Sequence, residues 1–365
     1  MIRQPHVKYK IMKQRVIITK SLATDLAMAI SECEHDRIFV LTDDTTRGKC
    51  WPVIENFIGL RDATVITIAP TDTHKNIESL VYVWRALERG HATRHSLLIN
   101  LGGGMVTDLG GFAASTFKRG IDFINIPTTL LAMVDASVGG KTGINLDNLK
   151  NEVGVFNDAK FVLLDTGFLK TLDDKNLRSG YGEMLKHGLI SNDKNWAELL
   201  NFDLDHPDLD HLADMLDTSV RIKERIVEKD PKEKGIRKAL NFGHTFGHAF
   251  ESFSLDRSKE NGTEPILHGY AVAYGVICEL YLSAIKAGFP ADKMRQTVTY
   301  IRENYGFMPI TCDDYPTLIE IMRHDKKNTA GVINFTLLSG VGEIHINQTA
   351  SEDEIKECLD FYREG

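Results

Sequence analysis

Short apolar runs rich in β-branched residues alternate with amphipathic stretches through the first half of the chain. Four of these runs end in small or polar residues, and they cover residues 37–41, 64–68, 96–101 and 123–126. Strands that alternate with helical stretches at this spacing predict βαβ units and a mostly parallel sheet. Because ligands of such sheets bind beyond the carboxyl ends of the strands, the polar residues at those ends are candidate binding residues.

The second half of the chain has mainly helical periodicity. Apolar residues recur at helical spacing in four segments, at residues 177–190, 214–229, 237–251 and 267–287. The pattern changes between about residues 158 and 172, and 365 residues exceed the usual size of one hydrophobic core. We therefore predict an α/β domain at residues 1–165 and an all-α domain at residues 166–365.

The composition excludes several classes of protein. The net formal charge of −8 argues against a protein that binds nucleic acid or a membrane surface, which would carry a basic footprint. An anionic ligand must then be held by a local cluster of basic residues. Five scattered cysteines without a Cys-x-x-Cys pair indicate reduced thiols, and the sequence contains neither a signal-peptide pattern nor an apolar run of about 18 residues. We expect a soluble cytoplasmic protein.

Two glycine-rich segments could approach a phosphate. The first follows the run at residues 96–101 and contains Gly103 and Gly104, and a predicted helix begins directly after it. Backbone N–H groups at such a turn can bind a pyrophosphate, although a tight structural turn also explains the glycines. The second, at residues 135–145, is predicted to be a polar loop and contains Lys141. Its basic residue suits a phosphate, and a solvated loop is the alternative.

Polar residues within the helical segments indicate a second site. Glu183 lies among apolar residues one turn before Lys186, and burying it requires a salt bridge to that lysine or a bound metal. His244 and His248 are four residues apart, so they lie on one face of a helix. Such a pair suits metal binding, proton transfer or a hydrogen-bonded core. His268 lies at the start of another helical segment.

These motifs together resemble the 3-dehydroquinate synthase family over about residues 37–340. The matching segments are, in chain order, Gly-Gly-Gly-Met-Val-Thr-Asp108, Lys-Arg119-Gly, Pro-Thr128-Thr129, Asp135-Ala-Ser-Val-Gly-Gly-Lys141-Thr-Gly, Lys150-Asn151, Gly-Glu183-Met-Leu-Lys186, Leu-Asn241-Phe-Gly-His244-Thr-Phe-Gly-His248, Leu-His268-Gly and Asp-Lys326-Lys. The resemblance implies an NAD-binding, Rossmann-like α/β domain followed by an all-α metal-binding domain, with the active site in the cleft between them.

The resemblance also implies residue roles. The implied ligands of a Zn²⁺ or Co²⁺ ion are Glu183, His244 and His268. The implied NAD-binding residues are Asp43, Asp72, Lys75, Gly103, Gly104, Asp108, Thr128, Thr129, Asp135 and Lys150. The implied substrate phosphate residues are Lys141, Asn151, Arg119 and Lys326, and those for the carboxylate and hydroxyls are Lys186, Lys223, Arg237 and Asn241. His248 resembles the residue that assists proton movement near the departing phosphate.

The family's substrate is 3-deoxy-D-arabino-heptulosonate 7-phosphate. In the family's reaction NAD oxidises C5 transiently, phosphate is eliminated, the ketone is reduced again, and the opened ring closes by an aldol step to 3-dehydroquinate. The family is commonly dimeric, and Arg119 could serve its own site or that of a neighbouring subunit. The alternatives are another sugar-phosphate cyclase, a metal-dependent polyol dehydrogenase and an inactive metal-binding scaffold. Each of these needs fewer basic side chains, or different ones, to bind its ligand.

Four features depart from the family pattern. Thr107 stands where a glycine is usual, Asp72 stands where a glutamate is usual, and residues 156–160 lack the usual proline-containing turn. Leu149 precedes Lys150 where a glycine is usual. We expect these departures to affect fine contacts with the cofactor and not the reaction.

Overall fold

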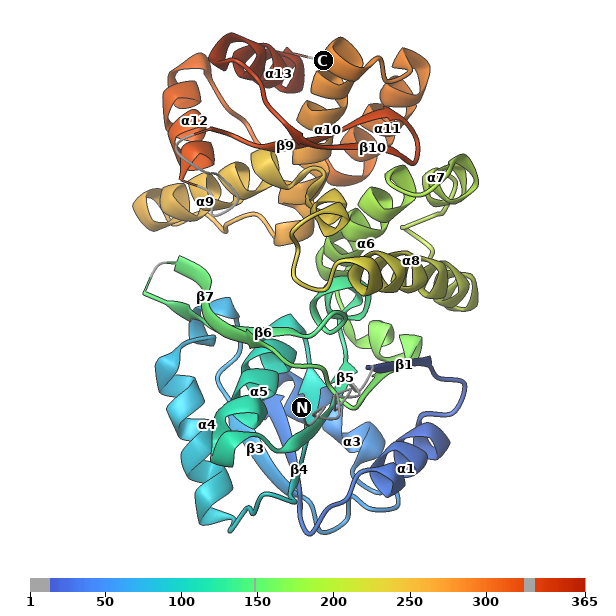
Figure 1. Cartoon of the computed structure of the whole chain (residues 1–365), viewed down its shortest axis with the longest axis vertical. Coiled ribbons are helices and arrows are strands. Elements are labelled where there is room, and N and C mark those ends of the chain that lie inside the picture. The colour runs from blue at the N-terminus through green and yellow to red at the C-terminus, as the bar shows by residue number, and fades with distance from the viewer. Residues whose placement is uncertain (1–13, 148, 325–331, 365) are drawn as a thin grey trace, which may run out of the picture. The chain divides into compact units, whose positions relative to one another are not determined.

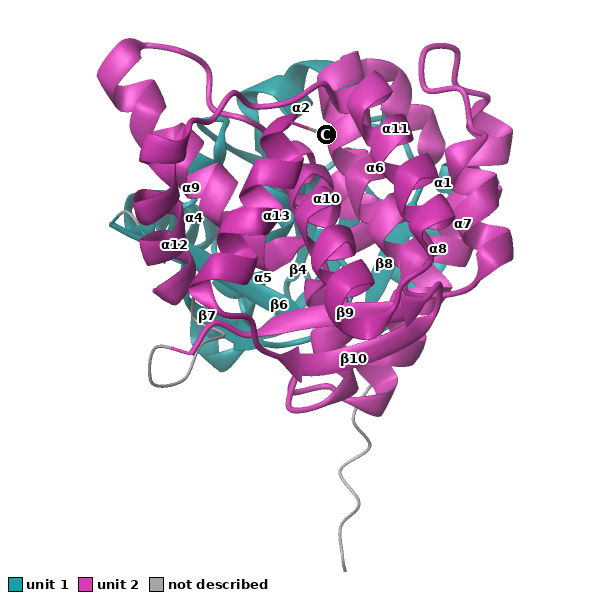
Figure 2. Ribbon diagram, turned by 90° about the horizontal axis from the view of Figure 1, so that it is seen from above, with its two compact units in different colours: residues 1–128, 136–165 teal, residues 129–135, 166–365 magenta. Residues whose placement is uncertain are grey.

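The strands predicted in the first half of the chain form one parallel sheet in the computed structural model, which describes residues 14–147, 149–324 and 332–364. The chain divides into unit 1, residues 1–128 and 136–165, and unit 2, residues 129–135 and 166–365. Figure 1 labels the elements, and Figure 2 colours unit 1 teal and unit 2 magenta.

Unit 1 is a doubly wound α/β structure. Its sheet strands are β1 (Arg15–Ile18), β2 (Ile38–Asp43), β3 (Thr64–Ile68), β4 (Leu97–Gly102), β5 (Asp122–Pro127) and β8 (Phe161–Leu164). Its helices are α1 (Leu22–Glu32), α2 (Asp44–Lys49), α3 (Trp51–Ile54), α4 (Ile77–Arg89) and α5 (Gly104–Thr116), with 3₁₀ turns at Asp72–His74 and Phe117–Arg119. Neighbouring strands in the order β1-β8-β5-β4-β2-β3 all pair in parallel, which confirms the predicted sheet.

The direction of the connections places helices on both faces of this sheet. From β1 through β2 to β3 the chain steps toward one edge, and from β3 through β4 and β5 to β8 it steps toward the other. Because such crossovers are right-handed, α1 to α3 cover one face and α4 and α5 cover the other. Trp84 of α4 donates from Nε1 to the Ala113 carbonyl of α5 at 3.3 Å. The direction reverses between β2 and β4, where doubly wound sheets bind their ligands.

The segment predicted as a polar loop at residues 135–145 is partly a β-ribbon. β6 (Lys141–Leu146) and β7 (Leu149–Phe156) pair antiparallel as a separate two-stranded sheet. Gly143 pairs with Gly154, and a Cβ at Gly154 would lie 2.2 Å from the Thr142 carbonyl oxygen, so glycine permits this close pairing. The loop prediction was wrong here because the glycines serve strand pairing, which satisfies the backbone groups of both segments.

Unit 2 is helical, as predicted, with one antiparallel ribbon. Its helices are α6 (Asp174–Leu189), α7 (Asp193–Leu200), α8 (Leu209–Lys229), α9 (His244–Asn261), α10 (His268–Ala287), α11 (Ala291–Tyr305), α12 (Tyr315–Arg323) and α13 (Glu352–Glu364). Shorter helical turns lie at Ala132–Ala136, Thr166–Thr171, Ile236–Asn241 and Cys312–Asp314. The ribbon consists of β9 (Phe335–Gly340) and β10 (Glu343–Gln348), so this unit is not purely helical.

Helix α10 is the core of unit 2. It packs against α6, α9, α11, α13 and β9. It is the one helix of the described residues that is long and apolar enough to cross a membrane, with a mean hydropathy of 1.2 over 18 of its residues. Because 67% of that 18-residue stretch is buried in the structure, packing within the protein accounts for its apolar character.

Candidate active site

Three side chains from three helices of unit 2 converge on one point. Glu183 lies in the middle of α6, His244 is the first residue of α9, and His268 is the first residue of α10. Glu183 Oε1 lies 3.3 Å from His244 Nε2 and 3.2 Å from His268 Nε2. One ligand atom from each residue lies within 4.8 Å of the other two. Two imidazoles and one carboxylate at this spacing are a ligand set for a divalent ion with open coordination positions.

The second nitrogen of each imidazole has an acceptor that orients the ring. His244 Nδ1 lies 3.1 Å from the Phe242 carbonyl oxygen, which can only accept, so Nδ1 carries the proton. His268 Nδ1 lies 3.2 Å from Glu251 Oε2, which fixes that ring in the same way. Each Nε2 therefore faces Glu183 and is the nitrogen that would bind an ion, on release of any proton that it carries. Partners of this kind orient the histidine ligands of metal sites, so these residues fit a Zn²⁺ or Co²⁺ ion.

Glycines bring the three helices close enough for this convergence. A Cβ at Gly269 of α10 would lie 1.7 Å from the Ser179 carbonyl oxygen of α6. A Cβ at Gly275 of α10 would lie 1.9 Å from the carbonyl oxygen of Gly243, directly before α9. Both distances are far inside van der Waals contact, so any larger residue would push the helices apart. The glycines of these helices are therefore a requirement of the site's geometry.

Two ion pairs, one fully buried and one part-buried, lie next to the three converging residues. Lys186 Nζ pairs with Glu183 Oε2, and Lys223 Nζ donates to Asp135 Oδ1 at 2.5 Å. Burial raises the pKa of the Glu183 carboxyl, but Lys186 and His244 outweigh burial and hold it well below its usual range. Burial likewise raises the pKa of Asp135, and Lys223 outweighs it, so that pKa is also lowered. Both carboxylates are therefore ionised at neutral pH.

Local charges also perturb the pKa of His268. Burial lowers its pKa, but Glu251 and Glu183 raise it more strongly, and the net effect raises the pKa to about 10. Two carboxylates around this imidazole thus favour positive charge at the point where Glu183, His244 and His268 meet. A site for a cation needs that electrostatic environment.

Three further predicted residues of unit 2 lie on α9 and on the helical turn Ile236–Asn241 before it. The ring of His248, half-buried on α9, has its centroid 5.3 Å from that of His244 and 6.1 Å from that of His268. Arg237 is buried and donates from Nη1 to the Pro231 carbonyl at 2.7 Å. Asn241 donates from Nδ2 to Glu233 Oε1 at 2.9 Å. Helical periodicity predicted that His248 and His244 lie on one face, whereas the contacts of Arg237 and Asn241 come from the 3₁₀ turn Ile236–Asn241.

In unit 1, several predicted cofactor residues form one polar cluster. Lys75 is buried, and its Nζ donates to Asp108 Oδ2 at 3.0 Å and to Asn151 Oδ1 at 2.5 Å. Asp72 lies 3.6 Å from Lys75 Nζ and 3.7 Å from Lys150 Nζ. The cluster joins the start of α5 to the ribbon strand β7. It therefore lies beside the glycine turn at the end of β4.

The carboxyl ends of β2, β4 and β5 carry the other predicted cofactor residues. Asp43 ends β2, and its side chain accepts from the Thr46 backbone N–H at 2.7 Å, which caps α2. Gly103 and Gly104 follow β4, and α5 begins there without a side-chain cap. Thr128 follows β5 and donates its backbone N–H to the Gly102 carbonyl. Thr129 Oγ1 accepts from the Ala132 N–H at 3.2 Å, as part of unit 2.

The three predicted phosphate residues that the structure describes are not gathered at one place. Lys141 begins β6 opposite Phe156, whereas Asn151 lies near the other end of the ribbon. Lys326 lies outside the described residues. Arg119 precedes β5, so it lies at the amino edge of the sheet, roughly 20 Å from the carboxyl edge for a six-residue strand. The grouping of these residues around one phosphate stays a prediction.

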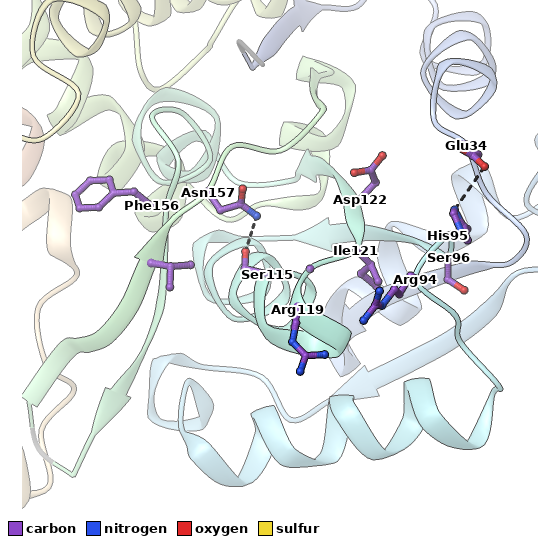
Figure 3. A pocket seen from close by; sticks show the side chains of 12 residues that line it. Glu34, Arg94, His95, Ser96, Ser115, Arg119, Ile121, Asp122, Phe156 and Asn157 are labelled. Carbon is purple, nitrogen blue, oxygen red and sulfur yellow. Dashed lines mark hydrogen bonds and ion pairs between the residues drawn. The ribbon is translucent and has the colours of Figure 1, made fainter. Parts of the chain in front are cut away.

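Arg119 lines a cavity of about 450 Å³ at the amino ends of β4 and β5 (Figure 3). The cavity also contains Arg94, Glu34 and Asp122, so its lining carries both signs of charge. The backbone at Arg119 has a positive φ of 72°, which non-glycine residues rarely adopt. Such strained positions are concentrated at functional sites. The cavity lies at the sheet edge opposite to the cofactor residues.

Two of the departures from the family pattern have structural partners. Thr107 is buried, and its Oγ1 donates to the Gly104 carbonyl at 3.1 Å, so the helix itself satisfies the extra hydroxyl. Asp72 accepts from Asn145 Nδ2 at 3.2 Å. Both side chains are thus accommodated beside the glycine turn. Phe156, at the third departure, is 60% exposed at the end of β7.

Sequence reasoning predicted no role for three residues near the converging ligands. Glu251 orients His268 and lies seven residues after His244 on α9, so helical spacing was a usable signal. Glu279 is a fully buried acid within the apolar helix α10, which was also a readable signal. His187 is fully buried, and its Nδ1 lies 2.7 Å from Ser219 Oγ. The sequence places His187 on the same helix face as Glu183, four residues before it, but no role was predicted for it.

Solved structures share this fold of a parallel α/β unit followed by a helical unit, and two of them are cyclases of phosphorylated or related sugars by their names. A 2-epi-5-epi-valiolone synthase from Streptomyces hygroscopicus subsp. jinggangensis 5008, solved with NAD⁺ and Zn²⁺ bound, has a TM-score of 0.85 at 24% identity and covers 100% of this chain and 99% of its own. A 2-deoxy-scyllo-inosose synthase complexed with carbaglucose-6-phosphate, NAD⁺ and Co²⁺ has a TM-score of 0.82 at 22% identity, with 96% of each chain covered.

The sequence comparisons identify the family. Residues 65–179 match the N-terminal domain of 3-dehydroquinate synthase, and residues 180–328 match its C-terminal domain. The 3-dehydroquinate synthase of Parabacteroides distasonis is 52% identical over 353 residues, which span 97% of this chain and 99% of that relative. The chain belongs to the 3-dehydroquinate synthase family of enzymes. The resemblance inferred from the motifs is thereby confirmed.

Proposed function

We propose that this chain converts 3-deoxy-D-arabino-heptulosonate 7-phosphate to 3-dehydroquinate and inorganic phosphate. The 52% identity to the 3-dehydroquinate synthase of Parabacteroides distasonis favours this reaction over another cyclisation. The structural observation that carries the proposal is the convergence of Glu183, His244 and His268, with both imidazoles oriented and with buried lysines beside them. An inactive metal-binding scaffold would need the oriented rings but not the buried cations.

In this proposal each unit holds one cofactor. NAD binds unit 1 at the reversal point of the sheet, where the uncapped start of α5 offers backbone N–H groups to the pyrophosphate. Zn²⁺ or Co²⁺ is held by Glu183, His244 and His268 of unit 2. When bound, the two groups supply a reversible hydride acceptor and a Lewis acid for the substrate hydroxyls. The two solved cyclases of similar fold contain NAD⁺, with Zn²⁺ in one and Co²⁺ in the other.

The side chains of the chain bind the substrate and move its protons. Arg237, Asn241 and Lys223 bind the carboxylate and hydroxyls, because charge-assisted hydrogen bonds can hold an anion in an acidic protein. Lys186 adds a buried positive charge next to Glu183. His248 accepts and returns a proton at a ring nitrogen near the departing phosphate, because an imidazole titrates near neutral pH.

The phosphate and NAD contacts complete the proposed assignment. Lys141 and Asn151, together with Lys326 and Arg119, bind the substrate phosphate. Asp135 and Lys150 link the nicotinamide region to the substrate. In the described structure Asp135 holds Lys223, and Lys150 lies near Asp72, so both are already part of polar networks.

The test is an assay of phosphate release from 3-deoxy-D-arabino-heptulosonate 7-phosphate, with absorbance at the NADH band recorded in parallel. Release should require catalytic NAD, should stop on chelation, and should resume with Zn²⁺ or Co²⁺. No NADH should accumulate, because oxidation and reduction occur at the same carbon. One NADH per phosphate, or steady NADH formation with glycerol in place of the substrate, would instead identify a polyol dehydrogenase.

We also propose that the protein is a homodimer in which Arg119 serves the phosphate site of the neighbouring subunit. The position of Arg119 at the amino edge of the sheet, away from the cofactor residues, supports this role. The exposed strand β7 supports an interface, since Leu149 and Phe156 are 58% and 60% exposed there. The five free cysteines, four of them buried, support a reducing cytoplasm as its location.

A further inference from the structure

A buried glutamate outside the three converging residues requires an explanation. Glu279 lies in the middle of α10, and its exposed fraction is 0%. Its neighbours along the helix include Val276, Ile277 and Leu280, all of which are buried. A carboxylate in such surroundings is strongly unfavourable unless hydrogen bonds replace its lost hydration. The partners of Glu279 therefore indicate what it does.

Both oxygens of Glu279 accept hydrogen bonds from the start of α9. Oε2 accepts from the Gly243 backbone N–H at 2.7 Å, and Oε1 accepts from the Thr245 backbone N–H at 3.0 Å. The first N–H groups of a helix lack acceptors within the helix and carry the positive end of its dipole. Because Gly243 occupies the capping position, α9 has no side-chain cap of its own. Glu279 supplies that cap from a different helix.

The two hydrogen bonds enclose His244. Gly243 precedes it and Thr245 follows it, so the backbone is held on both sides of the proposed metal ligand. The same helix α10 begins with His268, a second proposed ligand. α10 thus carries one ligand itself and holds the backbone of another. A movement of the first turn of α9 would break these bonds and displace His244 Nε2 from its position 3.3 Å from Glu183.

Steric contact between α9 and α10 does not fix the orientation of the first turn of α9, which the two hydrogen bonds do fix. The close contact of Gly275 with the Gly243 carbonyl oxygen sets a lower limit on the separation of α9 and α10. Repulsion of this kind does not prevent the first turn of α9 from rotating or moving outward. Hydrogen bonds to two N–H donors around one residue do prevent it, because both require one orientation of the turn.

We propose that Glu279 is a positioning residue that fixes His244 in its metal-binding geometry before the ion binds. This inference rests on the proposed metal site of Glu183, His244 and His268. Glu279 touches neither the ion nor the substrate in this assignment, and it acts through the backbone on either side of His244. Its contribution therefore appears in metal affinity and not only in stability.

The test compares Glu279→Gln with Ser283→Ala. The glutamine has nearly the same shape, but its amide nitrogen cannot accept from one of the two N–H groups. Ser283 is the control, because it is also fully buried on α10 and its Oγ accepts from the Leu338 N–H at 3.0 Å. Its Oγ also donates to the Glu279 backbone carbonyl at 2.6 Å, but it takes no part in the two bonds from the Glu279 carboxylate to α9. For each protein the Zn²⁺ dissociation constant is measured by competition with a chromogenic chelator, and stability is measured by denaturant unfolding of the metal-free protein.

Glu279→Gln should weaken Zn²⁺ binding roughly 10-fold or more, as loss of a residue that orients a ligand does. Ser283→Ala should keep the Zn²⁺ affinity of the unchanged protein, although its free energy of unfolding should fall about as much as that of Glu279→Gln. Equal affinity in the two variants would overturn the inference. A third variant, His268→Ala, tests whether the proposed metal site itself exists, independently of Glu279. If His268→Ala binds Zn²⁺ as tightly as the unchanged protein, the proposed site and the inference both fail.

A measurement on the unchanged protein covers the case in which Glu279→Gln does not fold. Hydrogen exchange of the Gly243 and Thr245 amides is followed in the metal-free protein. Slow exchange of both is expected, because the buried carboxylate holds them without the ion. Exchange as fast as that of exposed loop amides would overturn the inference.

Discussion

At the scale of single residues, the two oxygens of Glu183 have separate partners. Oε1 faces both histidine Nε2 atoms, and Oε2 pairs with Lys186. The sequence left a salt bridge and a metal ligand as alternatives, and the geometry accommodates both. The lysine neutralises one oxygen, so the carboxylate can stay ionised in a fully buried position while the other oxygen faces the histidines.

Lys186→Met should therefore destabilise the metal-free protein. The side chains of Lys186 and Glu183 are 1% and 0% exposed, so removing one partner leaves a buried charge without its counterion. We expect a loss of about 3–5 kcal/mol in the free energy of unfolding. Denaturant unfolding in excess chelator measures it. A loss below about 1 kcal/mol, as for an exposed pair, would show that the pair is not buried in solution.

The histidines at positions 248 and 268 should differ in function. His268→Ala should lose bound metal, because His268 Nε2 lies beside Glu183 and Glu251 orients its ring. His248→Ala should retain metal and lose phosphate elimination, because the proposed role of His248 is proton transfer. Elemental analysis of the purified variants and the phosphate-release assay separate the two effects. Equal metal loss in both variants would mean that His248 is a ligand.

At the scale of secondary-structure elements, α6, α9 and α10 act as one block because glycines remove the side chains between them. The contacts at Gly269 and Gly275 place backbone against backbone, and two of the ligands project from the first residues of their helices. Close packing makes such crossings sensitive to a single methyl group. The block explains why two helices can each contribute a ligand from their first residue.

Gly275→Ala should therefore destabilise the protein and weaken metal binding. Its Cβ would meet the Gly243 carbonyl oxygen at 1.9 Å, which forces α9 and α10 apart. We expect a loss of about 1–3 kcal/mol or more in thermal or denaturant unfolding, as for an overpacked core. Gly48→Ala is the control, because no atom lies within 4 Å of the position that its methyl group would occupy and α2 is helical there. That variant should be neutral or gain up to about 1 kcal/mol, and equal losses in both would refute the packing argument.

His187 should make the protein sensitive to acid. Burial and then the charge of Lys186 lower its pKa to about 3, below the value of 6.5 for an exposed histidine. Between these two values the unfolded chain binds a proton that the folded chain does not, so stability is present above about pH 6.5 and is lost as the pH falls toward 3.

His187→Asn tests this origin of the acid sensitivity. The variant keeps a hydrogen-bonding group opposite Ser219 Oγ but does not titrate. Its free energy of unfolding should change less between pH 7 and pH 5 than that of the unchanged protein. Parallel pH profiles for the two proteins would assign the acid sensitivity to other groups.

At the scale of the whole molecule, an acidic protein binds an anionic substrate through local cations. The net charge is −8, yet Lys186, Lys223 and Arg237 are all buried within unit 2. Buried cations keep their charge only beside carboxylates or other acceptors, and Lys223 illustrates this requirement. Burial lowers its pKa, and Asp135 raises it in partial compensation. The expected active site between the two domains stays a prediction.

Mixed dimers should test the role of Arg119 in a neighbouring subunit. Arg119→Ala and His248→Ala should each be inactive in phosphate release. If Arg119 serves the partner, random mixing should restore about one quarter of the activity, because half of the dimers are mixed and each has one intact site. Co-expression of the two differently tagged variants, followed by purification and assay, measures this recovery. An inactive mixture of folded mixed dimers would place Arg119 in its own subunit's site.

The sequence by itself determined the order of elements and the chemistry of the site. The strand predicted at residues 64–68 has the same bounds as β3 in the structure, because period-two apolar patterns and turn residues are local signals. The identities of Glu183, His244 and His268 followed from motifs that match the family. The position of His268 at a helix start was also readable, because apolar periodicity begins there.

Only the tertiary structure decided which atoms meet. The ribbon of β6 and β7, the proton on His244 Nδ1, and the bonds from Glu279 to the start of α9 all join atoms of different segments or depend on ring orientation. Glu279 and Gly243 are 36 residues apart, and no local periodicity encodes such a contact. The physical reason is that hydrogen bonds and close packing depend on distances of a few tenths of an ångström, which are set when the helices pack against one another.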